Sequence, residues 1–340
     1  MADPEIANPH GIPSWALTKN GVQFLDYPER AGGRLPDFCI IGAAKCATTS
    51  INDYLAQHPA VFMNPLNEPN YFSTDAHLAR GEQWYKGQYA DACANQICGE
   101  ASTSYTRYPV CQGTPARIAR ANPAMKLIYI VREPLARLKS DCLQKMKHAK
   151  HVQGNDLTDL SLDEMLDMAQ DPASAVYTSP LTTSQYLDQL RQYEPYFPRP
   201  QIHVVIYEAF VSRPQEVLAG IFRFLGVDDA FKVDMSERRN MTQTFTHSLA
   251  KERVLKPLRR LPGFGSLRHL VPRDLRRNIL EALVRRDNTP DPDFSPARLD
   301  QLKVHFLPHT EALENWLGFE LKEWREQGAN EANDRGDHVS

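Results

Sequence analysis

The sequence predicts an α/β fold with a central parallel sheet flanked by helices and followed by a helical C-terminal region. Three apolar runs, at residues 38–41, 126–131 and 202–208, are each followed by a stretch in which apolar residues recur with helical spacing. The first two runs are uninterrupted, which is typical of strands covered on both faces in a parallel sheet. In folds of this class, ligands bind at the carboxyl ends of the strands.

Local signals support each strand–helix unit. After the first run comes the loop GAAKCATTS, and then a helical pattern that ends before Pro59. The second run is followed by Pro134, which falls near the first turn of a helix, where its missing N–H costs little. The third run leads into a helix over residues 214–225, and Gly226 is the expected C-cap.

Composition along the chain predicts one principal domain. Residues 1–35 are rich in Pro, Gly and polar residues and indicate an irregular arm. Residues 36–325 are assigned to a single domain. Within it, the segment 148–180 is expected to be an insertion with an amphipathic helix that could cover a site. Residues 240–325 are expected to be a helical, partly basic C-terminal part, and the polar tail at 326–340 is expected to fray.

Charge and hydropathy exclude several classes of protein. Lys and Arg number 39 against 42 Asp and Glu, a net charge of −3 that argues against a nucleic-acid coat but leaves room for a local anion site. No apolar run approaches the ~18 residues that a membrane span needs. The first residues lack the pattern of a secretory signal, so a cytoplasmic location is expected. The 6 cysteines are too sparse for a disulfide framework and are expected to be reduced.

The loop at residues 42–50 has the composition of an anion-binding site. A loop that joins a buried strand to a helix presents backbone N–H groups at the positive end of the helix dipole. Lys45 adds a full charge, and hydroxyls follow in the first helical turn. Small residues leave room for close approach of an anion: Gly42, Ala43, Ala44 and Ala47. The plainer alternative is a capped helix after a core strand. The Walker A pattern is missing, which disfavours a nucleoside-triphosphate hydrolase.

The segment PDFCIIGAAKCATTSINDYLAQHP, residues 36–59, resembles the phosphosulfate-binding strand–loop–helix of sulfotransferases that use 3′-phosphoadenosine-5′-phosphosulfate (PAPS). Further segments match that family in the same order, up to about residue 228: NEPNYF at 67–72, GEASTSY at 99–105, VREPLARLKSDC at 131–142, and the stretch from Ser184 to Asp228. The first two of these resemble the glycan-sulfating branch. The resemblance implies a P-loop-like three-layer fold and transfer of the PAPS sulfuryl group to an acceptor hydroxyl.

By this resemblance, the loop binds the 5′-phosphate of the donor. Lys45 would contact that phosphate and the bridging oxygen and neutralise the leaving group. The residues implied in the cradle are Gly42, Ala43, Ala44, Lys45, Cys46, Ala47, Thr48, Thr49 and Ser50. Ala47 stands where the family usually has Gly. Because a left-handed Ala costs about 1 kcal/mol, we expect an ordinary negative φ at this position.

Other donor contacts are implied further along the chain. Arg132 and Ser140 match the family's 3′-phosphate ligands, and a guanidinium binds phosphate bidentately. The alternative for Arg132 is a surface ion pair, but its place directly after a buried strand favours the ligand role. Tyr186 and Ser184 match positions near the nucleotide. A late phosphate-contacting segment is expected at Arg238, Arg239 and Asn240.

Glu68 matches the carboxylate that deprotonates the acceptor hydroxyl in the glycan-sulfating branch, although a solvated loop Glu is the alternative. A Lys that assists in several family members is replaced here by Ala101. His148 lies on the same helix face as Ser140, eight residues later, and is a second catalytic candidate, with a surface role equally open. If neither is the base, Glu100 follows.

Three functional classes remain. A PAPS-dependent sulfotransferase accounts for the loop, the Arg132–Ser140 pair and Glu68 together. A nucleotide kinase accounts only for the loop, and a non-catalytic adenine-nucleotide-binding module leaves Glu68 without a role. We expect a small-molecule or glycan acceptor, no nucleic-acid partner and no metal, since no acidic metal pair accompanies the motifs. The basic stretch 251–286 fits an anionic acceptor or a solvated face, and the oligomeric state is left open.

Overall fold

Five parallel strands form one sheet, in the order β2-β3-β1-β4-β5. They appear in a computed structural model that describes residues 29–66, 68–152, 160–174, 176–236 and 292–324, with backbone only at 147–152. The strands are β1 (Phe38–Gly42), β2 (Val61–Met63), β3 (Ile97–Ala101), β4 (Lys126–Val131) and β5 (Ile202–Ile206). The predicted parallel α/β fold is therefore confirmed.

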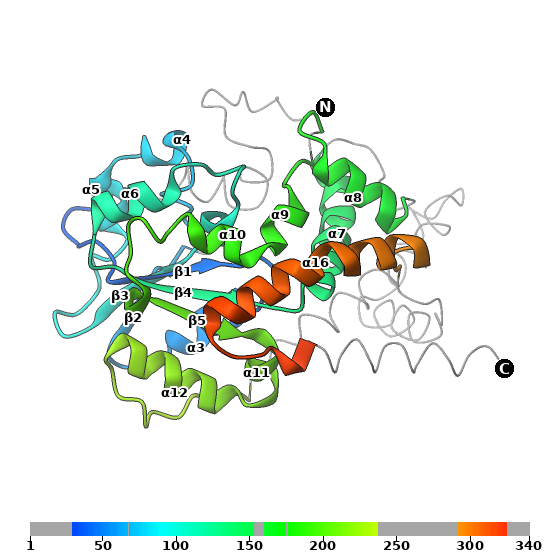
Figure 1. Ribbon diagram of the computed structural model, residues 1–340. Helices are drawn as coiled ribbons and strands as arrows, with labels where there is room; N and C mark the ends of the chain where they lie inside the picture. The colour runs from blue at the N-terminus through cyan, green and yellow to red at the C-terminus, as the bar shows by residue number, and fades with distance from the viewer. Residues whose placement is uncertain (1–28, 67, 153–159, 175, 237–291, 325–340) are drawn as a thin grey trace, which may run out of the picture. The chain divides into compact units, whose positions relative to one another are not determined.

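Helices cover both faces of the sheet, which gives three layers (Figure 1). One layer holds α3 (Thr48–Leu55), α11 (Tyr207–Ser212) and α12 (Pro214–Leu225). The opposite side carries α4 (Asp75–Leu78), α5 (Glu82–Gly87), α6 (Thr114–Ala121), α7 (Pro134–Val152), α8 (Leu162–Gln170), α9 (Pro180–Ser184) and α10 (Tyr186–Arg191). The long helix α16 (Pro296–Leu317) packs on α10 and α7, and short 3₁₀ turns lie at η2 (Thr103–Thr106) and η4 (Arg199–Gln201).

Strands β1 and β4 form the centre of the core. Each side chain from Phe38 to Ile41 and from Leu127 to Val131 is wholly buried, as expected for central strands with helices on both faces. Gly99 of β3 packs against the ring of Phe38, where a Cβ atom would lie 2.1 Å from the nearest ring carbon. Glycine therefore allows the close approach of these two neighbouring strands.

The third predicted strand is shorter than its apolar run. The sequence predicts a strand over 202–208, but pairing with β4 ends at Val131 and Ile206, and Tyr207 begins α11. Since β4 ends there, residues 207 and 208 have no ladder partner and turn into a helix instead. The predicted helix at 214–225 and its C-cap are confirmed, with Gly226 at φ 84°.

The amphipathic segment expected near 160–169 is α8, whose first turn carries a capping box between Ser161 and Glu164. Backbone contacts group residues 1–234 with 294–340 in one compact unit and 235–293 in another, and every element named above belongs to the first. Within the described ranges, no helix is both long and apolar enough to cross a bilayer.

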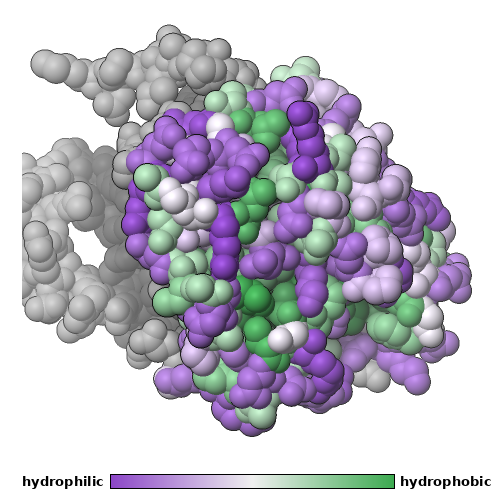
Figure 2. All heavy atoms as spheres, turned by 90° about the vertical axis from the view of Figure 1, so that its left-hand side faces the viewer, coloured by the Kyte–Doolittle hydropathy of each residue, from purple (hydrophilic) through white to green (hydrophobic). Residues whose placement is uncertain are grey.

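One face of the molecule shows how the described side chains are distributed. In Figure 2, the side of the molecule that lies to the left in Figure 1 carries narrow apolar strips separated by hydrophilic residues. The large apolar side chains of the sheet are instead buried beneath the helices.

Candidate active site at the carboxyl ends of the strands

Three neighbouring strands deliver the candidate residues to one edge of the sheet. β3, β1 and β4 are adjacent and parallel, so the segments that follow them begin side by side. The loop at 42–50 follows β1, the turn η2 follows β3, and Arg132 follows β4. This is the edge at which α/β folds bind ligands.

The loop presents unbonded helical N–H groups to this edge. Ala47 is the N-cap residue of α3 and has no side chain that can bond the first turn. The first intrahelical bond is donated by Ile51 to the carbonyl of Ala47, at 3.1 Å. The N–H groups of Thr48, Thr49 and Ser50 therefore lack an acceptor within the helix. Together with the helix dipole, these N–H groups make the N-terminus of α3 suitable for binding an anion.

The expectation of a negative φ at Ala47 is wrong. Ala47 lies in the left-handed region at φ 61° and ψ 25°, and Lys45 is also left-handed at φ 74°. Tertiary bonds determine this path, since the N–H of Ala43 donates to the carbonyl of Ile130 in β4 at 2.8 Å. The chain must then enter α3 within a few residues, which requires left-handed turns even without glycine.

Arg132 bonds to the loop, and Tyr186 bonds to Arg132. Arg132 Nη1 donates to the carbonyl of Lys45 at 3.2 Å, and its guanidinium lies 4.6 Å from the ring centre of Tyr207. The Tyr186 hydroxyl donates to the Arg132 carbonyl at 2.6 Å and accepts the Arg132 N–H at 3.3 Å. Tyr186 is only 2% exposed, and burial raises its pKa well above the usual value, so the hydroxyl keeps its proton.

Arg137 is a residue of this site that the sequence analysis missed. It is wholly buried in α7, and its guanidinium reaches three acceptors. Nε donates to Ser184 Oγ at 2.6 Å, Nη2 to the Pro180 carbonyl at 2.8 Å, and Nη1 to the Ala44 carbonyl in the loop at 3.4 Å. Arg137 therefore ties α9 to the loop. The sequence did hold a signal for this role: Arg137 is a charged residue on the buried face of a helix, and such a residue needs hydrogen-bond partners.

The remaining donor candidates are less fully placed. Ser184 accepts from Arg137 and donates to the Pro180 carbonyl at 3.1 Å, so its hydroxyl is occupied in supporting the site. Ser140 lies in the second turn of α7 and is partly exposed. The side chain of His148 lies outside the described side chains, and Arg238, Arg239 and Asn240 lie outside the described residues.

Glu68 lies in the loop after β2, at the same edge of the sheet. Its carboxylate accepts a hydrogen bond from Thr103 Oγ1 of η2 at 3.2 Å, and the side chain is partly exposed. The same turn is tied to β1, because Thr106 Oγ1 donates to the carbonyl of Ile41 at 3.0 Å. These bonds hold the Glu68 loop against the segment that begins the phosphate loop.

Glu100 is not a candidate base. The carboxyl group is 0% exposed and accepts from Tyr85 Oη at 2.6 Å, Tyr105 Oη at 2.7 Å and Ser102 Oγ at 3.1 Å. Burial raises the pKa of Glu100, against the effect of these hydrogen bonds. A wholly enclosed carboxyl cannot reach an acceptor hydroxyl, so Glu100 organises the core beneath β3.

In the described part of the chain, no group of three or more His, Cys, Asp and Glu is arranged to hold a metal ion.

Comparison with known proteins places this geometry in a family. A family model described as a sulfotransferase domain matches residues 35–253, which is more than half of the chain. The matched range contains the loop, Glu68, Arg132, Arg137 and Tyr186. It ends well before α16.

Among curated proteins, the chain is similar to heparan sulfate glucosamine 3-O-sulfotransferase 5 of Mus musculus, at 29% identity over 197 residues, or 57% of this chain and 54% of the relative. Heparan sulfate glucosamine 3-O-sulfotransferase 6 of the same species is 30% identical over 214 residues, or 63% of this chain and 58% of the relative. The chain thus spans a little over half the length of these relatives.

A solved structure, the sulfotransferase from Alicyclobacillus acidocaldarius, shares the fold with a TM-score of 0.62 at 23% identity. The match covers 86% of this chain and 99% of that chain. At this level of identity, the likeness concerns the fold.

Proposed function

Because the chain belongs to the sulfotransferase family, we propose that it moves the sulfuryl group of PAPS to an acceptor hydroxyl by in-line displacement. The acceptor oxygen forms a bond to sulfur while the bond from sulfur to the bridging phosphate oxygen breaks. The bridging oxygen keeps the electron pair, and 3′,5′-bisphosphoadenosine leaves. Such a transfer depends chiefly on positioning and on stabilising charge at the leaving oxygen.

The observation that carries this proposal is that the loop with Lys45, the N-terminus of α3 and the guanidinium of Arg132 meet at one edge of the sheet. The N–H groups of Thr48 to Ser50 suit a phosphate, and Lys45 stands in the same loop to stabilise the leaving oxygen. Arg132 is joined to that loop through the Lys45 carbonyl and offers its guanidinium to the second phosphate. The chain thus provides cationic or N–H donors for both phosphate groups of the donor.

Glu68 is proposed as the general base. Its carboxylate is held by Thr103 at 3.2 Å and remains partly exposed, which lets it reach a hydroxyl from outside. The proton of the acceptor hydroxyl passes to this carboxylate as the bond to sulfur forms. The acceptor proposed is a glycan or another small alcohol, in line with the glycan-sulfating relatives, and its identity requires a screen.

The screen supplies labelled PAPS with representative classes of acceptor hydroxyl and measures both the labelled product and 3′,5′-bisphosphoadenosine. Equal amounts of the two products with one acceptor class are expected. Donor binding with no product from any class would instead favour a non-catalytic nucleotide-binding module. Magnesium-dependent binding and turnover of a nucleoside triphosphate would favour a kinase.

Once an acceptor has been identified, the variant Glu68→Gln tests whether Glu68 is the general base. The amide keeps the shape and can still accept from Thr103, but it cannot take the proton, so kcat should fall about 10²–10⁴-fold while donor affinity is nearly unchanged. Glu82→Gln is the matched control. Glu82 is an exposed carboxylate of α5 that pairs with Lys86, and this variant should retain full turnover. If Glu68→Gln keeps more than roughly a tenth of wild-type turnover at saturating donor, another group is the base.

A further inference from the structure

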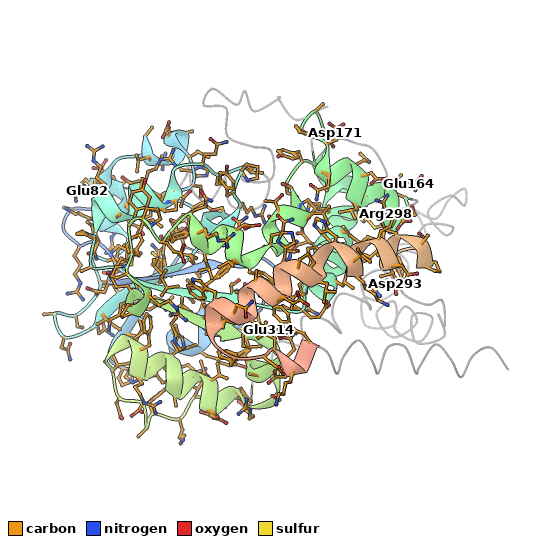
Figure 3. The ribbon with its side chains drawn as sticks, in the orientation of Figure 1. Glu82, Glu164, Asp171, Asp293, Arg298 and Glu314 are labelled. Atoms are coloured by element: carbon orange, nitrogen blue, oxygen red, sulfur yellow. The ribbon has the colours of Figure 1, made fainter. Side chains whose placement is uncertain are left out.

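The chain returns to the donor site after α16, beyond the range that the family model matches. The helix ends at Leu317 and Gly318, which is left-handed at φ 81°. The N–H of Leu321 then donates to Oε1 of Glu314 at 2.7 Å, and Leu321 is wholly buried. Figure 3 labels Glu314 near the C-terminal end of α16. These contacts fix the turn that leads to Trp324.

The other end of α16 is also held. Arg298 pairs with Asp167 of α8 at 2.9 Å, and Ser295 Oγ donates to Asp163 at 2.6 Å. Figure 3 labels Arg298 on α16 and Glu164 on α8, the two helices that these contacts join. With its two ends anchored, α16 sets the position of the segment that follows it.

Trp324 makes two contacts behind the donor site. Its indole Nε1 donates to Oε2 of Glu208 at 2.8 Å, and its ring centre lies 5.9 Å from that of Tyr186. Trp324 and Glu208 are each only 6% exposed, so the bond is shielded from water. A hydrogen bond to a shielded carboxylate is stronger than one at the surface.

The two partners of Trp324 hold adjacent residues of one backbone segment. Glu208 Oε1 accepts the N–H of Glu133 at 3.0 Å, while the Tyr186 hydroxyl donates to the carbonyl of Arg132 at 2.6 Å. Glu133 in turn caps α7, since its carboxylate accepts the N–H of Leu135 at 3.0 Å. Two separate routes from one indole therefore converge on the segment Arg132–Glu133.

We propose that Trp324 is a positioning residue of the donor site, acting through Glu208 and Tyr186 on the backbone that carries Arg132. This inference rests on the proposed function, which gives Arg132 the second phosphate of the donor. Without the indole N–H, Oε2 of Glu208 loses a donor in a buried place, and its carboxylate can turn away from Glu133. The guanidinium of Arg132 would then be held less firmly in the orientation that binds phosphate.

The test is calorimetric binding of 3′,5′-bisphosphoadenosine to the full chain, comparing wild type with Trp324→Phe. Phe keeps the ring beside Tyr186 and removes the N–H. The matched control is Trp316→Phe, because Trp316 lies in α16 itself and its Nε1 donates at 2.7 Å to Glu194, a different carboxylate from Glu208. The dissociation constant should rise about fivefold or more in Trp324→Phe and stay at the wild-type value in Trp316→Phe.

A second variant covers the case in which Trp324→Phe does not fold, as judged by circular dichroism. In Glu208→Gln, the side-chain carbonyl can still accept the N–H of Glu133, but the amide N–H then faces the indole N–H. Two donors cannot bond to each other, so this variant should weaken nucleotide binding to a similar extent. Combined with Trp324→Phe, it should add little, because both variants break one contact. In turnover assays, the KM for PAPS should rise more than kcat falls.

The outcomes separate the two proposals. The positioning role is overturned if the wild-type chain binds the bisphosphate and Trp324→Phe has the same dissociation constant. Where only Glu208→Gln folds, an unchanged dissociation constant in that variant overturns it in the same way. In both cases the proposed function still stands. Equal losses in Trp324→Phe and Trp316→Phe also overturn it, since they indicate a general effect of α16. Failure of the wild-type chain to bind the bisphosphate overturns the proposed function itself.

Discussion

Ala47 adopts a backbone conformation that glycine adopts at lower cost, at the N-cap of α3. Ala47→Gly should therefore raise the free energy of unfolding by about 1 kcal/mol, because the left-handed penalty of the Cβ outweighs the added chain entropy of Gly. Ala56→Gly is the control at the other end of the same helix. Ala56 is right-handed at φ −63°, so that change should lower stability by roughly 0.5–1 kcal/mol.

Urea denaturation of the two variants measures this difference. If Ala47→Gly is destabilised as much as Ala56→Gly, then Ala47 is not left-handed in the folded protein. The residue also shows a limit of sequence reasoning. The charge of Lys45 and the small residues around it are visible locally, but the sign of φ at Ala47 depends on bonds to β4, which no local pattern encodes.

Arg137 connects elements rather than acting alone, since it ties α7, α9 and the loop after β1. Arg137→Lys keeps the charge but offers a single nitrogen, which cannot reach all three acceptors. We expect the free energy of unfolding to fall by about 2–4 kcal/mol, because acceptors of a buried guanidinium lose their donors. Affinity for 3′,5′-bisphosphoadenosine should fall about tenfold, because the loop loses a tether.

Arg34→Lys is the control for this change. Arg34 also donates to a backbone carbonyl, that of Gln96, but it precedes β1 at the opposite edge of the sheet. The variant Arg34→Lys should lower the free energy of unfolding without changing the nucleotide affinity of the folded molecules. Nucleotide affinity and melting temperature that match wild type in Arg137→Lys would contradict the role given to the guanidinium.

Elements with a continuous apolar run could be predicted from the sequence, whereas others could not. β1 and β4 are read directly from such runs. β2 is only three residues long, and β3 contains Gly99 and Glu100, which a sequence pattern assigns to a loop. Tertiary structure explains β3, since Phe38 fills the space above Gly99 and buried hydroxyls satisfy Glu100.

At the scale of the whole molecule, the candidate site combines segments from residue 42 to residue 324 that have no local relation to one another. The order of the family segments gave Lys45, Arg132 and Tyr186 roles at one nucleotide, and in the structure Arg132 bonds to the Lys45 carbonyl while Tyr186 bonds to the Arg132 carbonyl. The sequence gives no indication of the role of Trp324, because a single Trp after a helix is part of no pattern that points to Glu208. Long-range partners of this kind become visible only when the fold is known.

The central claim is that the loop after β1 and the residue after β4 bind the phosphates of a nucleotide donor. Calorimetry with 3′,5′-bisphosphoadenosine tests it most directly, in wild type, Lys45→Ala and Arg132→Ala, with Lys86→Ala of the surface pair on α5 as control. A charge-assisted contact to phosphate is worth roughly 1.5–3 kcal/mol, so each site variant should bind about ten- to a hundredfold more weakly. The control should bind like wild type. Wild-type affinity in both Lys45→Ala and Arg132→Ala would contradict the account.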